Sequence, residues 1–355
     1  MYKSILITGG CGFVGSNLAI KLKSKFSDTR IIAFDNLKRR GSELNISRLR
    51  GSGVEFIHGD LRNRSDLDLV GPIDLLIEAA AEPSVLAGID NAPDYLLDTN
   101  LIGAINCLNY AVRHKAKIIF LSTSRVYPIN HLNKVNFSHG ETRFELLSDQ
   151  SIQGCTFEGI SEQFPLTGPR SLYGTSKLSA ELLIEEYSEF YGLPFIINRC
   201  GVLAGPWQMG KVDQGVVVLW VARHFWKKDL SYIGYGGSGK QIRDVLHIDD
   251  LFFLIVDQMH NFHLYERSTF NVGGGVNNSV SLFELTELCQ KVTGNTVHIN
   301  KVFDTRQADI PVYITNNTTI TAVNGWAPTL PVERTINDIH KWICDNEVSL
   351  NSILN

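Results

Sequence analysis

Neither a membrane-spanning segment nor a secretion signal is indicated by this sequence of 355 residues. Its apolar runs, such as "GVVVLWVA" and "LFFLIV", fall short of the roughly 18 residues that a membrane-spanning helix needs. They have the length of a core strand or core helix. The opening "MYKSILITGG" is not expected to be a signal peptide, because its apolar part is short and runs directly into glycines. We therefore expect no membrane partner.

Paired cysteines are also lacking. The six cysteines are scattered and form no Cys-x-x-Cys pair, which argues against a disulfide framework and against structural zinc. No cluster of His, Cys and Asp has the spacing of a metal site, so we expect no metal. The same pattern favours a reducing compartment, and we expect a cytoplasmic protein.

An excess of positive charge is missing too. The chain has 33 basic and 37 acidic residues, a net charge of -4, which gives no general attraction to nucleic acid or to anionic lipid. We expect no nucleic-acid partner. An apolar content of 44% and a charged content of 20% are ordinary for a globular protein, and the length suits two interlocked domains.

What the sequence does contain is a regular alternation of strand-like and helix-like segments in its first half. Helix-like stretches such as "NLAIKLKSKF" and "NLIGAINCLNYAVRH" separate most of the apolar, β-branched runs. Strands that alternate with helices predict an α/β fold, with a Rossmann-type doubly wound parallel sheet covered on both faces. The runs lie at residues 4–10, 30–35, 54–60, 73–81, 117–124 and 195–200.

From about residue 200 this alternation weakens, because glycine, proline and tryptophan interrupt "AGPWQMG", "GYGGSGK" and "NVGGGVNN". We expect residues 1–199 to form the sheet domain and residues 200–355 to form mainly a smaller, interleaved C-terminal lobe. The segments "RDVLHIDDLFFLIVDQM" and "TFNVGG" are expected to return to the first sheet, near residues 241–273.

The first strand-like run ends in "TGGCGFVGSNLA", where Gly9, Gly12 and Gly15 stand between a predicted strand and a predicted helix. A lone glycine pattern is also typical of a flexible loop, but in this context glycines let backbone N–H groups approach a pyrophosphate at the helix N-terminus. Asp35 closes the second strand and can accept hydrogen bonds from the adenosine ribose hydroxyls. Its carboxylate would repel a 2′-phosphate, so NAD is the expected cofactor and residues 1–199 the NAD-binding domain.

Two neighbouring stretches bear on the same site. The basic run Lys38, Arg39 and Arg40 keeps NADP open as an alternative, although it also suits a solvated loop. "GDLRN" follows the third strand and places Asp60 and Leu61 where an adenine edge could be met, although an ordinary turn aspartate is the alternative for Asp60. The expected cofactor-binding residues are Gly9, Gly12, Phe13, Val14, Gly15, Asp35, Asn36, Asp60, Leu61, Ala79, Ala80, Tyr173 and Lys177.

In "PRSLYGTSK", Tyr173 and Lys177 are four residues apart and would share one face of a helix. An ammonium beside the phenol favours the tyrosinate, but a lone surface lysine would not bring a group with a reference pKa of about 10 to neutrality. A bound cationic cofactor in a low dielectric could do so. We therefore interpret Tyr173 and Lys177 as functional residues because the sequence also predicts an NAD site.

Together these motifs resemble the extended short-chain dehydrogenases/reductases, specifically their nucleotide-sugar epimerases and dehydratases, from about residue 4 to about residue 340. The later stretches "STSRVY", "GSGKQIRDVLHIDD", "FNVGGG" and "RQAD" belong to the resemblance. It implies that Tyr173 exchanges a proton with a sugar hydroxyl and that Lys177 holds the nicotinamide ribose. It also implies that Thr123, four residues before Tyr127, is the catalytic hydroxyl.

The residues after Thr123 bear on the reaction type. Where the family's 4,6-dehydratases carry an Asp–Glu pair, this chain has Ser124 and Arg125. A guanidinium cannot act as a carboxylic acid or base, so elimination and decarboxylation are disfavoured, and hydride removal and return remains. Similar stretches such as "DQGVVVLW" resemble the family's epimerases that invert C2 of a CDP-deoxyhexose. A 4-epimerase of UDP-sugars stays open.

A nucleotide-sugar substrate needs cations and hydrogen-bonding groups. Arg243 and Arg306 lie where the family binds the diphosphate and the nucleoside, although a salt bridge is the plain alternative for each, with Asp244 or Asp309 as the partner. Asp213 could read sugar hydroxyls or merely shape its loop. The expected substrate-binding residues are Arg125, Gln208, Gln214, Arg243 and Arg306.

Three departures from the family leave the substrate open. Glu78 opens a loop that usually begins with histidine, Pro128 stands where glycine is usual, and residues 129–168 match poorly. Two other functions remain: a net sugar-nucleotide oxidoreductase, and a non-catalytic dinucleotide sensor, which the presence of Thr123, Tyr173 and Lys177 disfavours. The family resemblance also makes a homo-oligomer possible.

Overall fold

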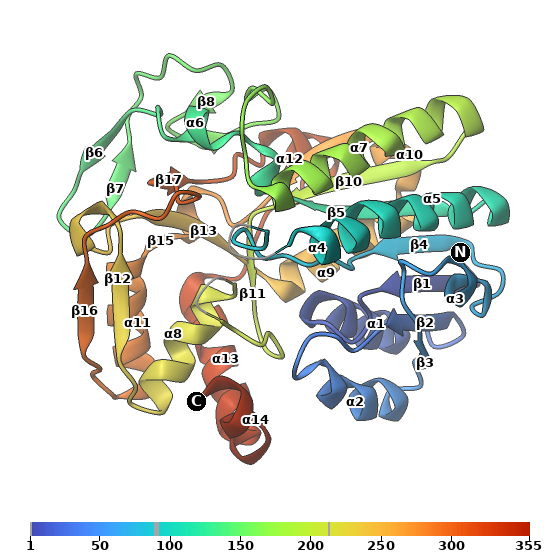
Figure 1. The fold of residues 1–355 in the computed structure, drawn as a ribbon, viewed down its shortest axis with the longest axis horizontal. Coiled ribbons are helices and arrows are strands. Elements are labelled where there is room, and N and C mark those ends of the chain that lie inside the picture. Colours follow the sequence, from blue (N-terminus) through green and yellow to red (C-terminus); the bar gives the residue numbers. More distant parts are fainter. Residues whose placement is uncertain (1, 89–91, 212–213) are drawn as a thin grey trace. The chain divides into compact units, whose positions relative to one another are not determined.

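The computed structural model describes residues 2–88, 92–211 and 214–355 (Figure 1). The chain forms two compact units. The first comprises Met1–Val126, Leu172–Arg199 and Phe252–Thr269, and the second comprises Tyr127–Ser171, Cys200–Leu251 and Phe270–Asn355. Each unit is described by itself below.

The first unit is built on a seven-stranded sheet in the order β14-β10-β5-β4-β1-β2-β3. β1, β2, β3, β4 and β5 pair in parallel, and the six strands expected from the sequence are all present, which confirms the predicted doubly wound α/β fold. The order reverses between β1 and β4, where the chain turns from building one half of the sheet to building the other. The strands are β1 (Ser4–Thr8), β2 (Arg30–Asp35), β3 (Glu55–His58), β4 (Leu75–Glu78), β5 (Lys117–Thr123), β10 (Phe195–Cys200) and β14 (Ser268–Val272).

Helices cover this sheet because each presents a run of apolar residues to it. α1 packs on β1 and β2, α5 packs on β4, and α7 packs on β5 and on α5. Ala104 and Leu108 of α5 and Ile184 of α7 belong to the same buried cluster as Leu76 and Ile118 of the sheet. Each large apolar side chain buried in this way contributes about 1.5–3 kcal/mol. The helical segments are α1 (Phe13–Lys25), η1 (Ser42–Leu44), α2 (Asn45–Gly51), α3 (Arg64–Asp68), α4 (Asp94–Leu97), η2 (Asp98–Ile102), α5 (Gly103–His114), η3 (Ser124–Val126), α7 (Leu172–Tyr191), α9 (Ile248–His260) and α10 (Phe262–Tyr265).

The second unit combines short strands with helices. β13 pairs with β11, β15 and β17 in a four-stranded sheet, and β12 pairs with β16. Its strands are β6 (Phe137–His139), β7 (Phe144–Leu146), β8 (Cys155–Thr156), β9 (Gly159–Ile160), β11 (Val202–Ala204), β12 (Leu230–Ile233), β13 (Ile242–His247), β15 (Ser279–Ser281), β16 (Ile299–Val302) and β17 (Val312–Tyr313). Its helical segments are α6 (Ile129–Leu132), α8 (Val216–Phe225), η4 (Tyr235–Gly237), η5 (Val276–Asn278), α11 (Leu282–Thr293), α12 (Thr318–Asn324), α13 (Val332–Asp345) and α14 (Glu347–Leu354).

Local sequence signals explain the ends of α11, a helix that packs on α8. Ser281 accepts a hydrogen bond from the backbone N–H of Glu284, and the Glu284 side chain accepts one from the Ser281 backbone N–H. This reciprocal cap satisfies two backbone donors that a helix start leaves open. The helix ends at Gly294, whose left-handed conformation (φ +70°) suits glycine.

The compact units differ in two places from the division expected at residue 199. Residues 127–171 group with the second unit, because β7 packs on β17 and β9 reaches Thr315 there. The return to the first unit begins at Phe252 of α9, since β13 hydrogen-bonds within the four-stranded sheet of the second unit. One boundary between the compact units lies between Arg199 and Cys200.

Two further properties of the described residues are relevant to the site. All six cysteines are free, and Cys344 is exposed while the others are buried. None of the helices in the described ranges has both the length and the apolar content needed to cross a membrane.

Candidate active site

The turn between β1 and α1 is shaped by glycines. Gly9 has φ +61°, and its carbonyl accepts a hydrogen bond of 2.9 Å from Gly12 N–H. A Cβ on Gly15 would lie 2.2 Å from Gly9 O, so α1 packs directly on the turn. α1 begins after Gly12 without a side-chain cap, which leaves its first-turn N–H groups available to an anion. This is a cradle that fits a pyrophosphate.

Asp35 ends β2 beside this turn. Its carboxylate accepts hydrogen bonds from the backbone N–H of Cys11 at 3.0 Å and of Leu37 at 2.7 Å. Burial raises the pKa of Asp35, and these backbone hydrogen bonds oppose that rise. The carboxylate is thus fixed next to the glycine turn, where it can accept hydrogen bonds from ribose hydroxyls.

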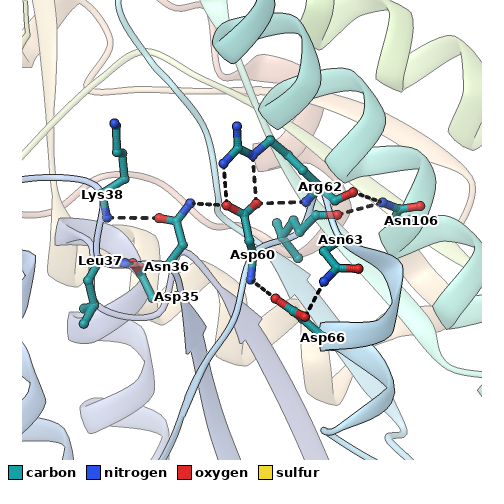
Figure 2. Close-up of polar contacts among 10 residues, drawn as sticks. Asp35, Asn36, Leu37, Lys38, Asp60, Arg62, Asn63, Asp66 and Asn106 are labelled. Carbon is teal, nitrogen blue, oxygen red and sulfur yellow. Dashed lines mark hydrogen bonds and ion pairs between the residues drawn. The ribbon is translucent and has the colours of Figure 1, made fainter.

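The predicted adenine-side residues form a polar network (Figure 2). Asp60 is bound by Arg62 through two hydrogen bonds of 3.0 and 2.7 Å, and Asn36 donates to it at 3.1 Å. The hydrogen bond from Arg62 is the main cause that lowers the pKa of Asp60 to about 2. The backbone carbonyl of Leu61 accepts a hydrogen bond of 2.7 Å from Asn106, which ties the loop to α5.

The segment after β4 reaches the glycine turn from the other side. The hydroxyl of Thr8 accepts hydrogen bonds from the backbone N–H groups of Ala79 and Ala80 at 3.2 and 3.3 Å. A Cβ on Gly9 would lie 2.9 Å from Ala79 O. The structure therefore brings both predicted alanines to the turn at the carboxyl ends of β1 and β4.

The predicted catalytic residues lie in the first unit. Thr123 is the last residue of β5 and is 8% exposed, and its hydroxyl accepts a hydrogen bond of 3.2 Å from the Arg125 backbone N–H. Tyr173 and Lys177 lie in the first two turns of α7, 9% and 2% exposed. α7 packs on β5 and on η3, the turn that follows Thr123.

Glu78, a departure from the family pattern, contacts one of these residues. Its carboxylate lies 3.3 Å from Lys177 Nζ, and the two side chains are 3% and 2% exposed. Lys177 Nζ also lies 3.8 Å from the centre of the Phe120 ring. Burial raises the pKa of Glu78, and the neighbouring ammonium opposes that rise.

A chain of hydrogen bonds from Asn100 through Ser176 to the Tyr173 backbone was not predicted from the sequence. Asn100 donates to the hydroxyl of Ser176 at 3.1 Å, and Ser176 donates to the Tyr173 carbonyl at 2.8 Å. The Asn100 side chain also accepts from Glu82 N–H at 2.8 Å. Asn100 lies in η2, a π-helical turn, and no spacing in the sequence marks such a turn.

The predicted substrate cations lie in the second unit. Arg243 donates to Asp309 at 3.0 Å and to the Ile310 carbonyl at 2.8 Å, so the salt-bridge alternative is realised with Asp309. This contact fixes the segment that carries Arg306, which is half-buried. These contacts use part of the hydrogen-bonding capacity of the Arg243 guanidinium.

The remaining predicted substrate residues are divided between the two units. Gln208 donates to the Leu203 carbonyl at 3.0 Å, and its buried side-chain oxygen has no hydrogen-bond partner in the described structure. Gln214 pairs through its backbone with Lys211. Arg125 is half-buried in η3 of the first unit. Asp213 lies outside the described residues.

Comparison with known proteins identifies the family. The sequence pattern of the NAD dependent epimerase/dehydratase family matches residues 5–273. The chain belongs to this family. This membership confirms two predictions: the chain is an NAD-dependent enzyme, and its cofactor is NAD. The glycine cradle and the fixed carboxylate of Asp35 fit that cofactor.

Two curated relatives cover almost the whole chain. CDP-paratose 2-epimerase of Salmonella typhi is 31% identical over 95% of this chain and 98% of its own length. A probable UDP-glucuronate 4-epimerase of Rhizobium meliloti is 26% identical over 96% of this chain and 97% of its own.

Solved structures agree with the fold. dTDP-glucose 4,6-dehydratase of Bacillus anthracis, in complex with NAD, superposes with a TM-score of 0.75 at 26% identity over 99% of both chains. UDP-glucose 4-epimerase of Thermotoga maritima, with UDP-glucose, gives a TM-score of 0.78 at 24% identity over 97% of this chain and 99% of the other, a likeness of fold alone.

Proposed function

We propose that this enzyme epimerises a nucleotide-diphospho-sugar and that its substrate is CDP-paratose, inverted at C2 to CDP-tyvelose. The observation that carries the reaction type is the turn after β5. Thr123 ends β5, on which α7 packs, and Ser124 and Arg125 follow it. An elimination reaction would need carboxylates at these two positions, so their absence favours epimerisation. The similarity to CDP-paratose 2-epimerase over 95% of the chain supports the choice of sugar.

The chain's own residues move a proton and hold the cofactor. NAD, when bound, would supply the acceptor for a hydride from the sugar carbon and the donor for its return. Tyr173 accepts the proton of the sugar hydroxyl as the ketone forms and gives it back afterwards, and Thr123 hydrogen-bonds the same oxygen. Lys177 lies one turn along α7 from Tyr173, so its ammonium favours the tyrosinate and holds the nicotinamide ribose.

Four further residues are proposed to bind the nucleotide part and the sugar of the substrate. Arg243 and Arg306 bind the diphosphate and the nucleoside, while Gln208 and Gln214 contact the sugar or the base. Because the diphosphate stays anchored, the keto sugar can turn its other face to the nicotinamide without leaving. Return of the hydrogen to that face inverts the carbon and consumes no cofactor.

Running the reaction in heavy water tests this mechanism. We expect product without deuterium on the inverted carbon, because the hydrogen never exchanges with solvent. One deuterium per product at that carbon would instead indicate an enediol route and would end this proposal. NMR of the same sample locates the inverted carbon, and inversion at C4 would favour the alternative, a UDP-sugar 4-epimerase.

Two other functions are separated by simpler measurements. A net sugar-nucleotide oxidoreductase would release reduced or oxidised cofactor with each turnover, whereas the epimerase keeps its nicotinamide. Nucleotide released by denaturing the purified protein reveals which cofactor is held. A non-catalytic sensor would bind NAD and leave every nucleotide sugar unchanged.

A further inference from the structure

Glu78 is a buried acid at the end of β4 with a buried cation as its partner. Its carboxylate and Lys177 Nζ are 3.3 Å apart, and neither side chain is more than 3% exposed. Removing one member of such a pair leaves an uncompensated charge away from water, which is strongly unfavourable. Glu78 is therefore the counter-charge of Lys177 in the first unit of the chain.

The surroundings of this pair hold other charges, but most are already balanced or in water. Glu181, one turn further along α7, is ion-paired with Arg199 at 2.7 Å. Asp94 and Asp98 are exposed. Charged and titratable groups on the elements that pack on α7 include Cys107 of α5, Arg125 of η3, Asp94 and Tyr95 of α4, Asp98 of η2 and Lys117 of β5. α7 itself carries Tyr173 and Glu181, the partner of Arg199.

The sheet topology indicates which part of the cofactor this pair meets. In a doubly wound sheet a dinucleotide lies across the point where the strand order reverses, with one mononucleotide over each half. Here the order reverses between β1 and β4. Asp35 ends β2 on the proposed adenosine side, so the nicotinamide half of a bound NAD would lie over β4 and β5, whose last residues are Glu78 and Thr123.

We propose that Glu78 biases the bound nicotinamide toward its oxidised form by balancing the charge of Lys177. The oxidised ring carries a positive charge that the reduced ring lacks. A nearby ammonium alone would therefore favour the reduced cofactor, and a carboxylate beside that ammonium restores the preference for the oxidised one. Such a bias returns the enzyme to its resting state after each turnover.

The midpoint potential of the bound nicotinamide measures this bias without any sugar. The purified protein with its nicotinamide is equilibrated anaerobically against a reference couple of known potential, and the reduced cofactor is read by its absorbance. For Glu78→Gln we expect the reduced form to gain about tenfold relative to the wild type, a rise of about 30 mV for a two-electron couple. A midpoint that does not move would overturn the proposal.

Glu78→His keeps the test decisive if Glu78→Gln does not fold, because histidine is the usual residue at this position in the family. It removes the carboxylate and leaves Lys177 in place to hold the cofactor. We expect its midpoint also to rise by about 30 mV, equivalent to about tenfold in favour of the reduced form. A midpoint within about 10 mV of the wild type, equivalent to about twofold, would contradict the proposal.

Glu181→Gln is the matched control, because it removes another buried acid of the same unit that is paired with Arg199 instead of Lys177. We expect its midpoint to match the wild type, and a shift as large as that of Glu78→Gln would refute a specific role for Glu78. The inference rests on the proposed placement of the nicotinamide but not on the proposed sugar. Deuterium in the epimerisation product would leave this measurement valid.

Discussion

Gly15→Ala tests whether the glycine turn is the pyrophosphate cradle. A Cβ at this position would lie 2.2 Å from Gly9 O, 2.8 Å from Gly9 C and 2.9 Å from Gly10 Cα. All three are backbone atoms, so no side chain can rotate away and α1 must move off the turn. Overpacking a well-packed site typically lowers the free energy of unfolding by about 1–3 kcal/mol. Because this contact is so short, we expect Gly15→Ala to lower it by about 3 kcal/mol. The first-turn N–H groups of α1 move with the helix, so NAD retention should fall at least about tenfold.

The control for this prediction is Gly51→Ala at the end of α2, where an added Cβ would meet nothing within 4 Å. Replacing an exposed helical glycine by alanine stabilises by up to about 1 kcal/mol and should leave NAD content unchanged. Chemical denaturation gives the free energy of unfolding of both variants, and released nucleotide gives their NAD content. A Gly15→Ala protein as stable and as fully loaded as Gly51→Ala would refute the account of the turn.

Three further predictions concern single side chains. Tyr173→Phe should keep the fold and NAD content but lower turnover about 10²–10⁴-fold, since only the proton-transfer group is lost; unchanged turnover would remove Tyr173 from the mechanism. Asp35→Ala should weaken NAD retention and relax discrimination against NADP, and native protein loaded with NADP would contradict this. Asp60, with its pKa lowered to about 2, should stabilise the fold above pH about 4 and lose that contribution as pH falls through about 2. Arg62→Ala should abolish this part of the acid transition in a pH series of unfolding measurements, and an unaltered series would show that the pair contributes nothing.

The parallel sheet could be predicted because each of its strands is a continuous apolar run between turns, a pattern that a fully buried strand requires. β13 shows the limit of that reasoning. Its sequence, "IRDVLH", is as buried as a strand of the first sheet, yet it pairs with β11, β15 and β17 in the second unit. Which strand accepts its hydrogen bonds depends on long-range contacts that an apolar pattern does not encode.

The candidate site likewise contains residues that local spacing indicates and residues that only long-range packing brings together. Glycines and a strand-ending aspartate follow a spacing set by local geometry, so Gly9, Gly12 and Asp35 could be identified in the sequence. The partner of Lys177 could not, because Glu78 lies 99 residues away in the sequence and meets it only through the packing of α7 on the sheet. Its departure from the family pattern was the one signal available.

Glu78 also bears on the choice between epimerisation and elimination, because it is a carboxylate close to the proposed catalytic residues. A general acid must come within about 2.6–3.2 Å of the atom that it protonates. Glu78 is 3% exposed and its carboxylate is directed at Lys177, so it cannot reach a sugar without breaking the buried ion pair. Burial does raise its pKa, which favours the protonated form that an acid needs. The ion pair with Lys177 opposes that role, because Glu78 would have to leave it to protonate a sugar hydroxyl. The turn after Thr123 carries Arg125 in place of a second acid.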